Sequence, residues 1–336
     1  MKVDTGLPHT RLDPTDAVQA AVANGYDAVW VGETQHDPML TLALASRVAP
    51  GLALGTGILV AFARSPMTTA VSANDLQFLT GGNFMLGLGS QVKPHIERRF
   101  SMPWSKPAAR MREYVLALRA IWAAWAGEAP LAFEGEFYRH TLTSPYFNPG
   151  PNPYGNPDVL IAGVGPAMTE VAGEVADGFL LHAFTTERYV RELTLPALAA
   201  GAAKNGRNPD GITLVGGPFV VTGENEEAMA HAAKAVRGQI SFYGSTPAYR
   251  PVLELHGWGD LQGELHALAK QNRWAEMDDL VDDEMLETFA IVAEPDDVAP
   301  TLLRRYGDII DRVAIHAPYT SSESLWAPIA AQLRAG

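Results

Sequence analysis

The sequence predicts a (β/α)8 barrel, and three observations support this fold class. Short β-rich runs alternate with helical segments along the whole 336-residue chain. Several of these runs end in glycine, at Gly55–Ile58, Gly87–Gln91 and Ala162–Pro166, and a predicted helix follows each. A parallel sheet gathers the carboxyl ends of its strands at one rim, where ligands bind. Since glycine has no Cβ, such a rim lets backbone approach a flat ring or a phosphate, and we expect a cofactor site there.

Eight strands are predicted, each followed by helical sequence. They are Lys2–Leu7, Ala28–Val31, Ala53–Val60, Phe84–Leu88, Val159–Ala162, Phe179–His182, Ile212–Val221 and Arg312–His316.

Helix boundaries are marked by proline and glycine. A capping side chain precedes proline in Asp13-Pro14, Asp37-Pro38 and Ser65-Pro66, and more loosely in Glu294-Pro295. The first three helices are predicted to stop at Gly25, Gly51 and Gly81. After the fourth strand, apolar residues recur at helical spacing and predict one buried stripe. The stripe consists of Met111, Tyr114, Val115, Leu118, Ile121, Trp122 and Trp125.

Residues 1–336 are expected to form a single domain with two insertions, at about 126–157 and 224–287. Long insertions at a barrel rim commonly act as lids or substrate walls, and we expect both at the C-terminal rim.

Composition excludes several classes of function. The net charge of −13 argues against nucleic acid or an anionic membrane as the main partner. The absence of cysteine excludes thiolate chemistry and Cys-ligated metal sites. No His-x-His pair occurs among the nine histidines, so no metal site is predicted. No charged-then-apolar leader and no apolar stretch of spanning length is present, and we expect a cytoplasmic protein.

A set of ordered motifs resembles the bacterial luciferase-like superfamily. They are Trp30-Val31-Gly32-Glu33, Gly55-Thr56-Gly57-Ile58 with Arg64-Ser65-Pro66, Gly87-Leu88-Gly89-Ser90-Gln91, and Ala162-Gly163-Val164-Gly165-Pro166 followed by Ala172-Gly173-Glu174-Val175-Ala176-Asp177-Gly178. The segment Ser90–Tyr114 is most similar to the branch that uses the deazaflavin coenzyme F420. The resemblance implies a barrel that binds F420 or FMN, commonly as a homodimer.

The resemblance also implies which residues hold the cofactor. A bulge after the third strand, at Thr56, Gly57 and Ile58, would support the ring through a cis Gly57–Ile58 bond. Ser90 and Gln91 would touch its polar edge, although an N-cap serine in a loop explains them too. Phosphate binding is predicted at a glycine turn that leads into a helix, where free amides face outward, although a plain tight turn is the alternative. This segment is Gly163, Val164, Gly165, Pro166, Ala167 and Met168. Glu174, farther along, is expected to be structural.

Acid–base candidates lie where strands end. Glu33, His36 and His182 are predicted as catalytic residues, with Thr34 and His316 as further candidates. A histidine at a strand end often serves packing instead. Known F420-dependent sugar and alcohol dehydrogenases of this type carry an acidic residue followed directly by histidine after the second strand, whereas this chain has Glu33-Thr34. Asp37 is expected to cap a helix, and His95, Arg98 and Arg99 to lie on a solvated face, the alternative being contact with the anionic tail of F420.

These observations lead to one principal functional hypothesis. The chain is predicted to be an F420-dependent oxidoreductase that transfers a hydride between C5 of the deazaflavin and a small organic substrate. The alternative is an FMN-dependent luciferase-like monooxygenase. A cofactor-binding protein without turnover is the third hypothesis, and a metal-dependent barrel hydrolase is disfavoured.

Overall fold

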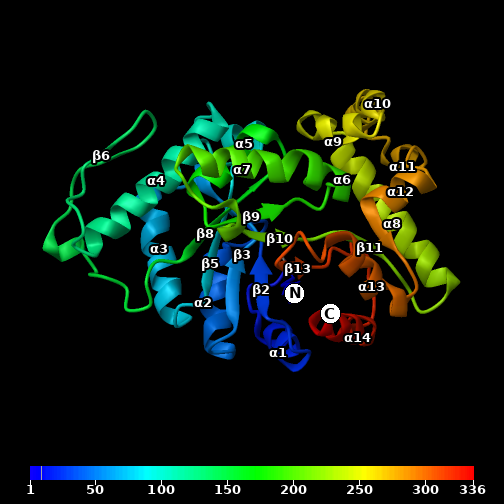
Figure 1. Cartoon of the computed structure of the whole chain (residues 1–336), viewed down its shortest axis with the longest axis horizontal. Coiled ribbons are helices and arrows are strands. Elements are labelled where there is room, and N and C mark those ends of the chain that lie inside the picture. The colour runs from blue at the N-terminus through cyan, green and yellow to red at the C-terminus, as the bar shows by residue number, and fades with distance from the viewer. Residues whose placement is uncertain (9) are drawn as a thin grey trace.

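The computed structural model describes residues 1–8 and 10–336, and its centre is a closed barrel of eight parallel strands (Figure 1). Around the barrel the order is β3, β2, β1, β13, β10, β9, β8 and β5, and a direct pairing of β5 with β3 closes it. The fold class predicted from the sequence is confirmed. The strands are β1 (Lys2–Gly6), β2 (Ala28–Val31), β3 (Ala53–Thr56), β5 (Phe84–Gly89), β8 (Asp158–Gly163), β9 (Gly178–Leu181), β10 (Thr213–Gly216) and β13 (Arg312–Ala314).

Two of the predicted strands are each split into two pieces. Residues 53–60 form β3 and the short β4 (Leu59–Val60), which pairs with β5, and the Gly57–Ile58 peptide bond between them is cis. Residues 212–221 form β10 and β11 (Phe219–Val221). Strand β11 leaves the barrel and pairs in parallel with β12 (Ala290–Val292). Both runs stay apolar through the break, so hydrophobic pattern alone predicted continuous strands.

Helices surround the barrel and largely begin and end where the sequence indicates. They are α1 (Thr15–Ala23), α2 (Pro38–Val48), α3 (Pro66–Leu79), α4 (Pro107–Trp125), α5 (Pro166–Val175), α6 (Glu187–Tyr189), α7 (Leu195–Lys204), α13 (Pro295–Tyr306) and α14 (Glu323–Ala335). Asp37 and Ser65 cap α2 and α3, accepting from the amides of Met39 and Thr68.

Two N-terminal caps were predicted wrongly. Asp13 instead accepts from Thr15, and α1 has no side-chain cap. Glu294 stands at the N-cap of α13 without a side-chain bond. The three predicted stops, Gly25, Gly51 and Gly81, all have positive φ, the conformation that glycine adopts without strain.

The apolar stripe predicted after the fourth strand is the buried face of α4. All seven of its residues, from Met111 to Trp125, belong to the main hydrophobic core. The indole N–H of Trp122 donates to the carbonyl of Ala70 at 3.2 Å, which satisfies the polar atom of an otherwise apolar side chain. Each large side chain fully buried in this way contributes about 1.5–3 kcal/mol. The interpretation of these tryptophans as core residues is confirmed.

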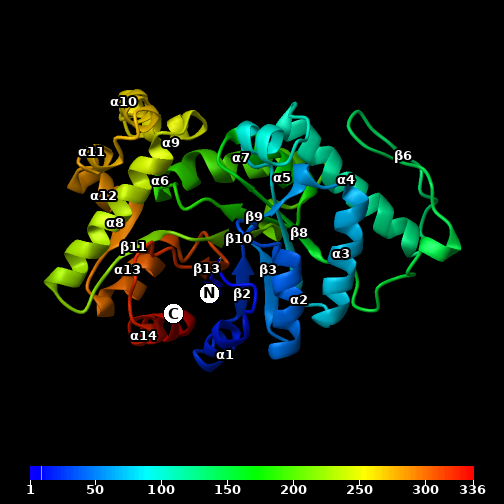
Figure 2. The same ribbon diagram turned by 180° about the vertical axis from the view of Figure 1, so that it is seen from behind.

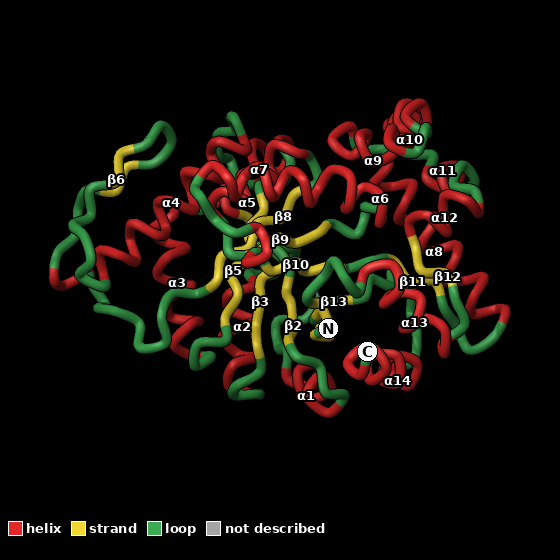
Figure 3. Tube along the Cα trace, in the orientation of Figure 1, coloured by secondary structure: helices red, strands yellow, loops and turns green. Residues whose placement is uncertain are grey.

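The first insertion, residues 126–157, does not lie where it was expected. It connects the end of α4 to the start of β8, so it leaves and rejoins the barrel at the amino ends of the strands. It forms an arm with a short hairpin, β6 (Phe133–Glu134) and β7 (Arg139–His140), drawn mostly as loop in Figure 3. The Glu113 carboxylate of α4 accepts from three amides of the arm, including Tyr138 at 2.6 Å. The predicted position of this insertion on the C-terminal rim is wrong.

The second insertion, residues 224–287, does follow strand carboxyl ends, between β11 and β12. It is almost wholly helical and consists of α8 (Glu226–Gly244), α9 (Arg250–Leu255), α10 (Gly259–Lys270), α11 (Trp274–Asp278) and α12 (Asp283–Phe289). Seen from the front and from behind, it lies at the opposite end of the molecule's long axis from the arm (Figures 1 and 2). Only this insertion is placed to contribute to the rim.

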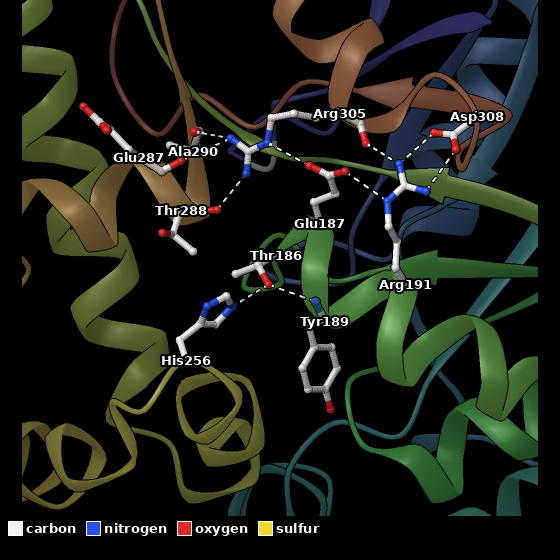
Figure 4. A network of polar contacts seen from close by, with 10 residues as sticks. All are labelled: Thr186, Glu187, Tyr189, Arg191, His256, Glu287, Thr288, Ala290, Arg305 and Asp308. Carbon is white, nitrogen blue, oxygen red and sulfur yellow. Dashed lines mark hydrogen bonds and ion pairs between the residues drawn. The ribbon is translucent and has the colours of Figure 1, made fainter.

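A polar network ties the helical insertion to the barrel (Figure 4). The guanidinium of Arg305 on α13 donates to the carbonyls of Thr288 and Ala290, at the junction of α12 and β12, and pairs with Glu187. The hydroxyl of Thr186 bonds the ring of His256 at 2.8 Å. These contacts join the segment after β9, the helical insertion and α13, which are far apart in the sequence.

No helix in the described part of the chain is long and apolar enough to cross a membrane.

Candidate active site at the carboxyl rim of the barrel

A large aromatic side chain fills the middle of the barrel. Successive strand residues point to opposite sides, and Trp30 shares an inward-facing cluster with Leu160, Leu180 and Val215. A Cβ at Gly55 would stand 2.4 Å from the Trp30 ring, so glycine makes room for this indole. The barrel interior is therefore packed at this level.

The Trp30 ring is oriented by a buried ion pair. Its indole N–H donates to Asp4 at 2.9 Å, and Asp4 accepts two bonds from Arg312 at 2.7 and 2.8 Å. Burial raises the pKa of Asp4 against the opposing effect of Arg312. A buried carboxylate of this kind needs its partner, because an unpaired charge in the interior is costly.

Glycines line the carboxyl end of the barrel interior, which we call the inner rim and define by Gly6, Gly57, Gly89, His182 and His316. A Cβ at Gly6 would meet no atom within 4 Å, so the space beside it is open. A Cβ at Gly57 would lie 3.7 Å from the side chain of Trp30, at ordinary van der Waals distance. At Gly89 the space is taken by the side chain of Ile58, at 2.7 Å. A flat ring would thus meet backbone and Ile58.

The bulge at Gly57–Ile58 is held from the side of β2. Gly57 donates its amide to Val31 at 2.8 Å, and Glu33 donates its own amide to the carbonyl of Ile58 at 2.9 Å. The Glu33 carboxylate accepts from the amide of Val60 at 2.8 Å and from Arg64 at 2.6 Å. Glu33 therefore fastens the carboxyl side of the bulge, in a role different from the predicted acid–base catalysis.

Arg64 bridges two carboxylates, and we call Glu33, Arg64 and Asp37 together the clamp. Its second nitrogen donates to Asp37 at 2.9 Å, while Asp37 also caps α2. The side chain of Glu33 is 8% exposed and that of Arg64 is 18% exposed, so water screens the pair only weakly. The clamp links the bulge, the start of α2 and the loop before α3. Glu33 and Asp37 were noticed in the sequence, but their shared partner was not.

Thr56 lies next to the bulge and joins β3 to β5. It is completely buried, and its hydroxyl donates to the carbonyl of Gly87 at 2.8 Å. A Cβ at Gly87 would stand 1.9 Å from the Thr56 carbonyl, so the two strands approach closely only because of this glycine.

The predicted phosphate segment has the expected geometry. Gly165 is the N-cap residue of α5 and Pro166 occupies its first turn, with no side-chain cap in the described structure. The amides of Ala167 and Met168 belong to the turn that lacks intrahelical acceptors. A Cβ at Gly163 would clash with Met168 at 2.8 Å, so glycine brings the helix close to β8. Glu174 is buried and paired with Arg112, as a structural residue would be.

His182 lies at the end of β9, at an inward-facing position two residues beyond Leu180. Its Nδ1 accepts from the amide of Phe184 at 3.0 Å, and its Nε2 lies 3.3 Å from the Tyr249 hydroxyl. Burial lowers the pKa of His182 to about 4, with a further contribution from His316. The imidazole is therefore neutral near pH 7. His316, at the end of β13, packs edge-on against Phe219 at 5.1 Å.

The structure does not bring every predicted residue to the inner rim. His36 and Thr34 are exposed, and the Thr34 carbonyl accepts from Arg99. Ser90 and Gln91 are half-buried and bond locally: the Ser90 hydroxyl donates to the carbonyl of Gln91 at 3.1 Å. His95, Arg98 and Arg99 lie on a short, mainly exposed π-helical turn after β5.

Sequence reasoning missed the two tyrosines that contact His182. Tyr243 meets the imidazole edge-on, with ring centroids 4.7 Å apart, and Tyr249 lies tilted against it at 4.9 Å. Both come from the helical insertion, where nothing in the local pattern distinguishes them from surface aromatics. Asp4 and Arg312 could have been found from the sequence, because a charged residue inside an apolar strand requires a partner.

A hollow lies at the opposite end of the barrel. It has a volume of about 670 Å³ and is lined partly by Asp158, Asp177 and Asp311, at the amino ends of strands. Barrels of this type bind ligands at the carboxyl ends, so we place the site at the inner rim. Among the side chains that the structure describes, no group of three or more His, Cys, Asp or Glu is arranged to hold a metal.

Comparison with known proteins identifies the family. The profile of the luciferase-like monooxygenase family matches residues 10–312, and the chain belongs to this family. It is 50% identical over 313 residues to an uncharacterized protein of Mycobacterium tuberculosis, covering 93% of this chain and 92% of that one. It is also 30% identical over 291 residues to the 5,10-methylenetetrahydromethanopterin reductase of Archaeoglobus fulgidus, covering 84% and 82% of the two chains.

The fold is shared with a solved reductase structure. The F420-dependent tetrahydromethanopterin reductase of Methanopyrus kandleri superposes with a TM-score of 0.80 at 21% identity, covering 100% of this chain and 99% of that one. The resemblance to the luciferase-like superfamily is confirmed, and its members are oxidoreductases and monooxygenases that act on small molecules.

Proposed function

We propose that this protein is an F420-dependent oxidoreductase that transfers a hydride between C5 of the deazaflavin and a small organic substrate. The observation that carries the proposal is the inner rim, where the space beside Gly6 is open and a flat ring would meet the backbone of Gly57 and the side chain of Ile58. The similarity to the A. fulgidus reductase, and the fold shared with an F420-dependent reductase, favour F420 over FMN.

The residues present fit such a cofactor. Thr56, Gly57 and Ile58 would support one face of the ring, and Ser90 and Gln91 offer uncharged donors and acceptors to its polar edge. The start of α5, from Gly163 to Met168, presents uncapped amides and the positive end of a helix dipole to a phosphate. When bound, the cofactor supplies hydride chemistry that no side chain can.

His182 is the acid–base residue that the geometry favours among the three predicted. It faces the interior, it is neutral, and its Nδ1 is occupied by a backbone amide, so Nε2 carries the hydrogen. Glu33 acts by holding the bulge, and the exposed His36 would reach a substrate only from outside the rim.

A binding titration separates the two cofactor hypotheses. F420 and FMN are each added to the apoprotein and their fluorescence is followed. We expect tight binding of F420 and weak binding of FMN. Tight FMN binding without F420 binding would favour the alternative, an FMN-dependent monooxygenase, which the family assignment supports. Binding of F420 with no redox change over a broad substrate panel would favour a cofactor-binding protein without turnover.

We also propose a homodimer, built on the outer faces of α2 and α3. These helices together contain two charged residues, Arg47 and Asp75, and they expose large apolar side chains. Among these are Leu40 at 60% exposure and Phe78 at 58%. In a two-fold interface each patch meets its own copy, so Arg47 could pair with Asp75 of the partner. Phe78→Glu should convert a dimer into a monomer in light scattering after size exclusion, and a wild-type monomer would refute the proposal.

A further inference from the structure

The helical insertion places one hydroxyl beside the inner rim. Tyr249, just before α9, has its Oη 3.3 Å from Nε2 of His182. Since His182 faces the barrel interior, this phenol lies next to the space in which we propose that substrate binds. The barrel strands themselves do not supply this hydroxyl.

The hydrogen bonds around His182 run in one direction. The amide of Phe184 donates to Nδ1 at 3.0 Å, so the single hydrogen of the neutral ring is on Nε2. Nε2–H then donates to the oxygen of Tyr249. The phenolic hydrogen must point elsewhere, and the described structure shows no other hydrogen bond from this hydroxyl.

Aromatic rings pack against the ring of Tyr249 and hold its orientation. Phe184 stacks on the Tyr249 ring with centroids 5.6 Å apart, and Tyr243 meets it edge-on at 6.0 Å. Hydrogen bonds are stronger in such surroundings, and successive donors polarise one another.

We propose that Tyr249 is a specificity-determining donor that selects substrates carrying an acceptor atom, a carbonyl oxygen or imine nitrogen, at the reacting carbon. This inference rests on the proposed function only in taking the inner rim as the substrate site. Burial raises the pKa of Tyr249 to about 12, which keeps the hydroxyl protonated across the physiological range. A donor beside the reacting carbon suits reduction of a polar double bond, because the heteroatom gains negative charge as the carbon receives hydride.

The test uses cofactor-free protein and two probes of matched shape, cyclohexanone and methylenecyclohexane. Their dissociation constants are measured by following the Nε2–H signal of His182 in ¹⁵N-histidine-labelled protein. We expect wild type to bind the ketone about fivefold more tightly than the alkene, the effect of one hydrogen bond. Tyr249→Phe should bring this ratio to one while keeping the ring contacts with Phe184.

Tyr243→Phe is the matched control. Tyr243 touches the same imidazole at 4.7 Å without a hydrogen bond to it, so this variant should keep the fivefold preference. Equal binding of the two probes by wild type, or a preference that survives in Tyr249→Phe, would overturn the proposal. Because no cofactor is present, this outcome is independent of whether the protein uses F420 or FMN.

Discussion

The two halves of the inner rim are built in different ways. On the side of β2, β3 and β5, backbone and glycine form the surface, and the charged side chains of Glu33 and Arg64 are turned outward to hold the bulge. On the side of β9, β10 and β13, imidazole rings face inward, and the tyrosines of the helical insertion pack over His182.

We expect the two sides to have different roles, one toward the cofactor and the other toward the substrate. A backbone surface is stiff and uncharged, which suits a planar ring that must be held in one position. The imidazole and phenol groups provide hydrogen-bond donors, which suit a substrate whose charge changes during reaction. Changes on the glycine side should therefore alter cofactor binding or stability, and changes on the histidine side should alter substrate selection and pH behaviour.

The largest effect is expected from Arg64→Met. It leaves the carboxylate of Glu33 buried without its cation, which costs about 3–5 kcal/mol in comparable pairs. Urea unfolding should show this loss, together with weaker cofactor binding. Arg139→Met is the control, because Arg139 pairs with Glu134 at the surface, where both side chains are more than half exposed. Its loss should stay within about 1 kcal/mol. Equal losses in the two variants would mean that the clamp does not hold the bulge.

His182 should make the folded protein sensitive to acid. Its pKa lies near 4 when folded, against an ordinary value of 6.5. The unfolded chain therefore binds the proton first as pH falls. The contribution is fully retained above pH 6.5 and is lost between about 6.5 and 4, by up to about 3 kcal/mol.

The check for this prediction is denaturant unfolding of wild type and His182→Gln at pH 7 and pH 4.5. The variant should lose less stability on acidification than wild type. If both lose the same amount, His182 is not held neutral by the fold.

Gly6→Phe probes the glycine side directly. The space beside Gly6 is open, so the protein should fold with an unchanged melting temperature while the new ring occupies the cofactor position. We expect F420 affinity to fall about 100-fold, which corresponds to about 2.8 kcal/mol. Gly211→Phe, at an open position near the amino ends of the strands, should leave affinity unchanged. Undiminished binding by Gly6→Phe would place the ring elsewhere.

Thr186→Val should have the smallest effect. It removes the hydroxyl that bonds His256 at 2.8 Å and caps α6, with an expected cost of about 1 kcal/mol. Hydrogen exchange should then quicken in α9 and α10 and stay constant in the barrel strands. Uniform exchange changes would show that the insertion does not open separately.

Much of the fold followed from local pattern. The eight barrel strands, the stops at Gly25, Gly51 and Gly81, and the buried face of α4 depend on periodicity, caps and turn residues, which act over a few positions. The break at Gly57–Ile58 was implied by family resemblance, whereas periodicity predicted a continuous strand. The path of the 126–157 arm was predicted wrongly, because composition does not show which end of the barrel a connection occupies.

Less of the site could be predicted. His182 was chosen for its place at a strand end, and the barrel does turn it inward. His36, chosen on the same ground, is exposed. The partners of Glu33 and His182 come from 31 and 67 residues away, so no local pattern could indicate them.

By itself, the sequence determined that parallel strands alternate with helices, that small residues stand at their carboxyl ends, and that no thiolate takes part in the chemistry. Only the tertiary structure decided that Glu33 belongs to the clamp, that His182 stays neutral, and that Tyr249 lies beside His182. The residue type fixes which chemical group a side chain carries. Its protonation state and the direction of its hydrogen bonds depend on neighbours that the folded chain brings together.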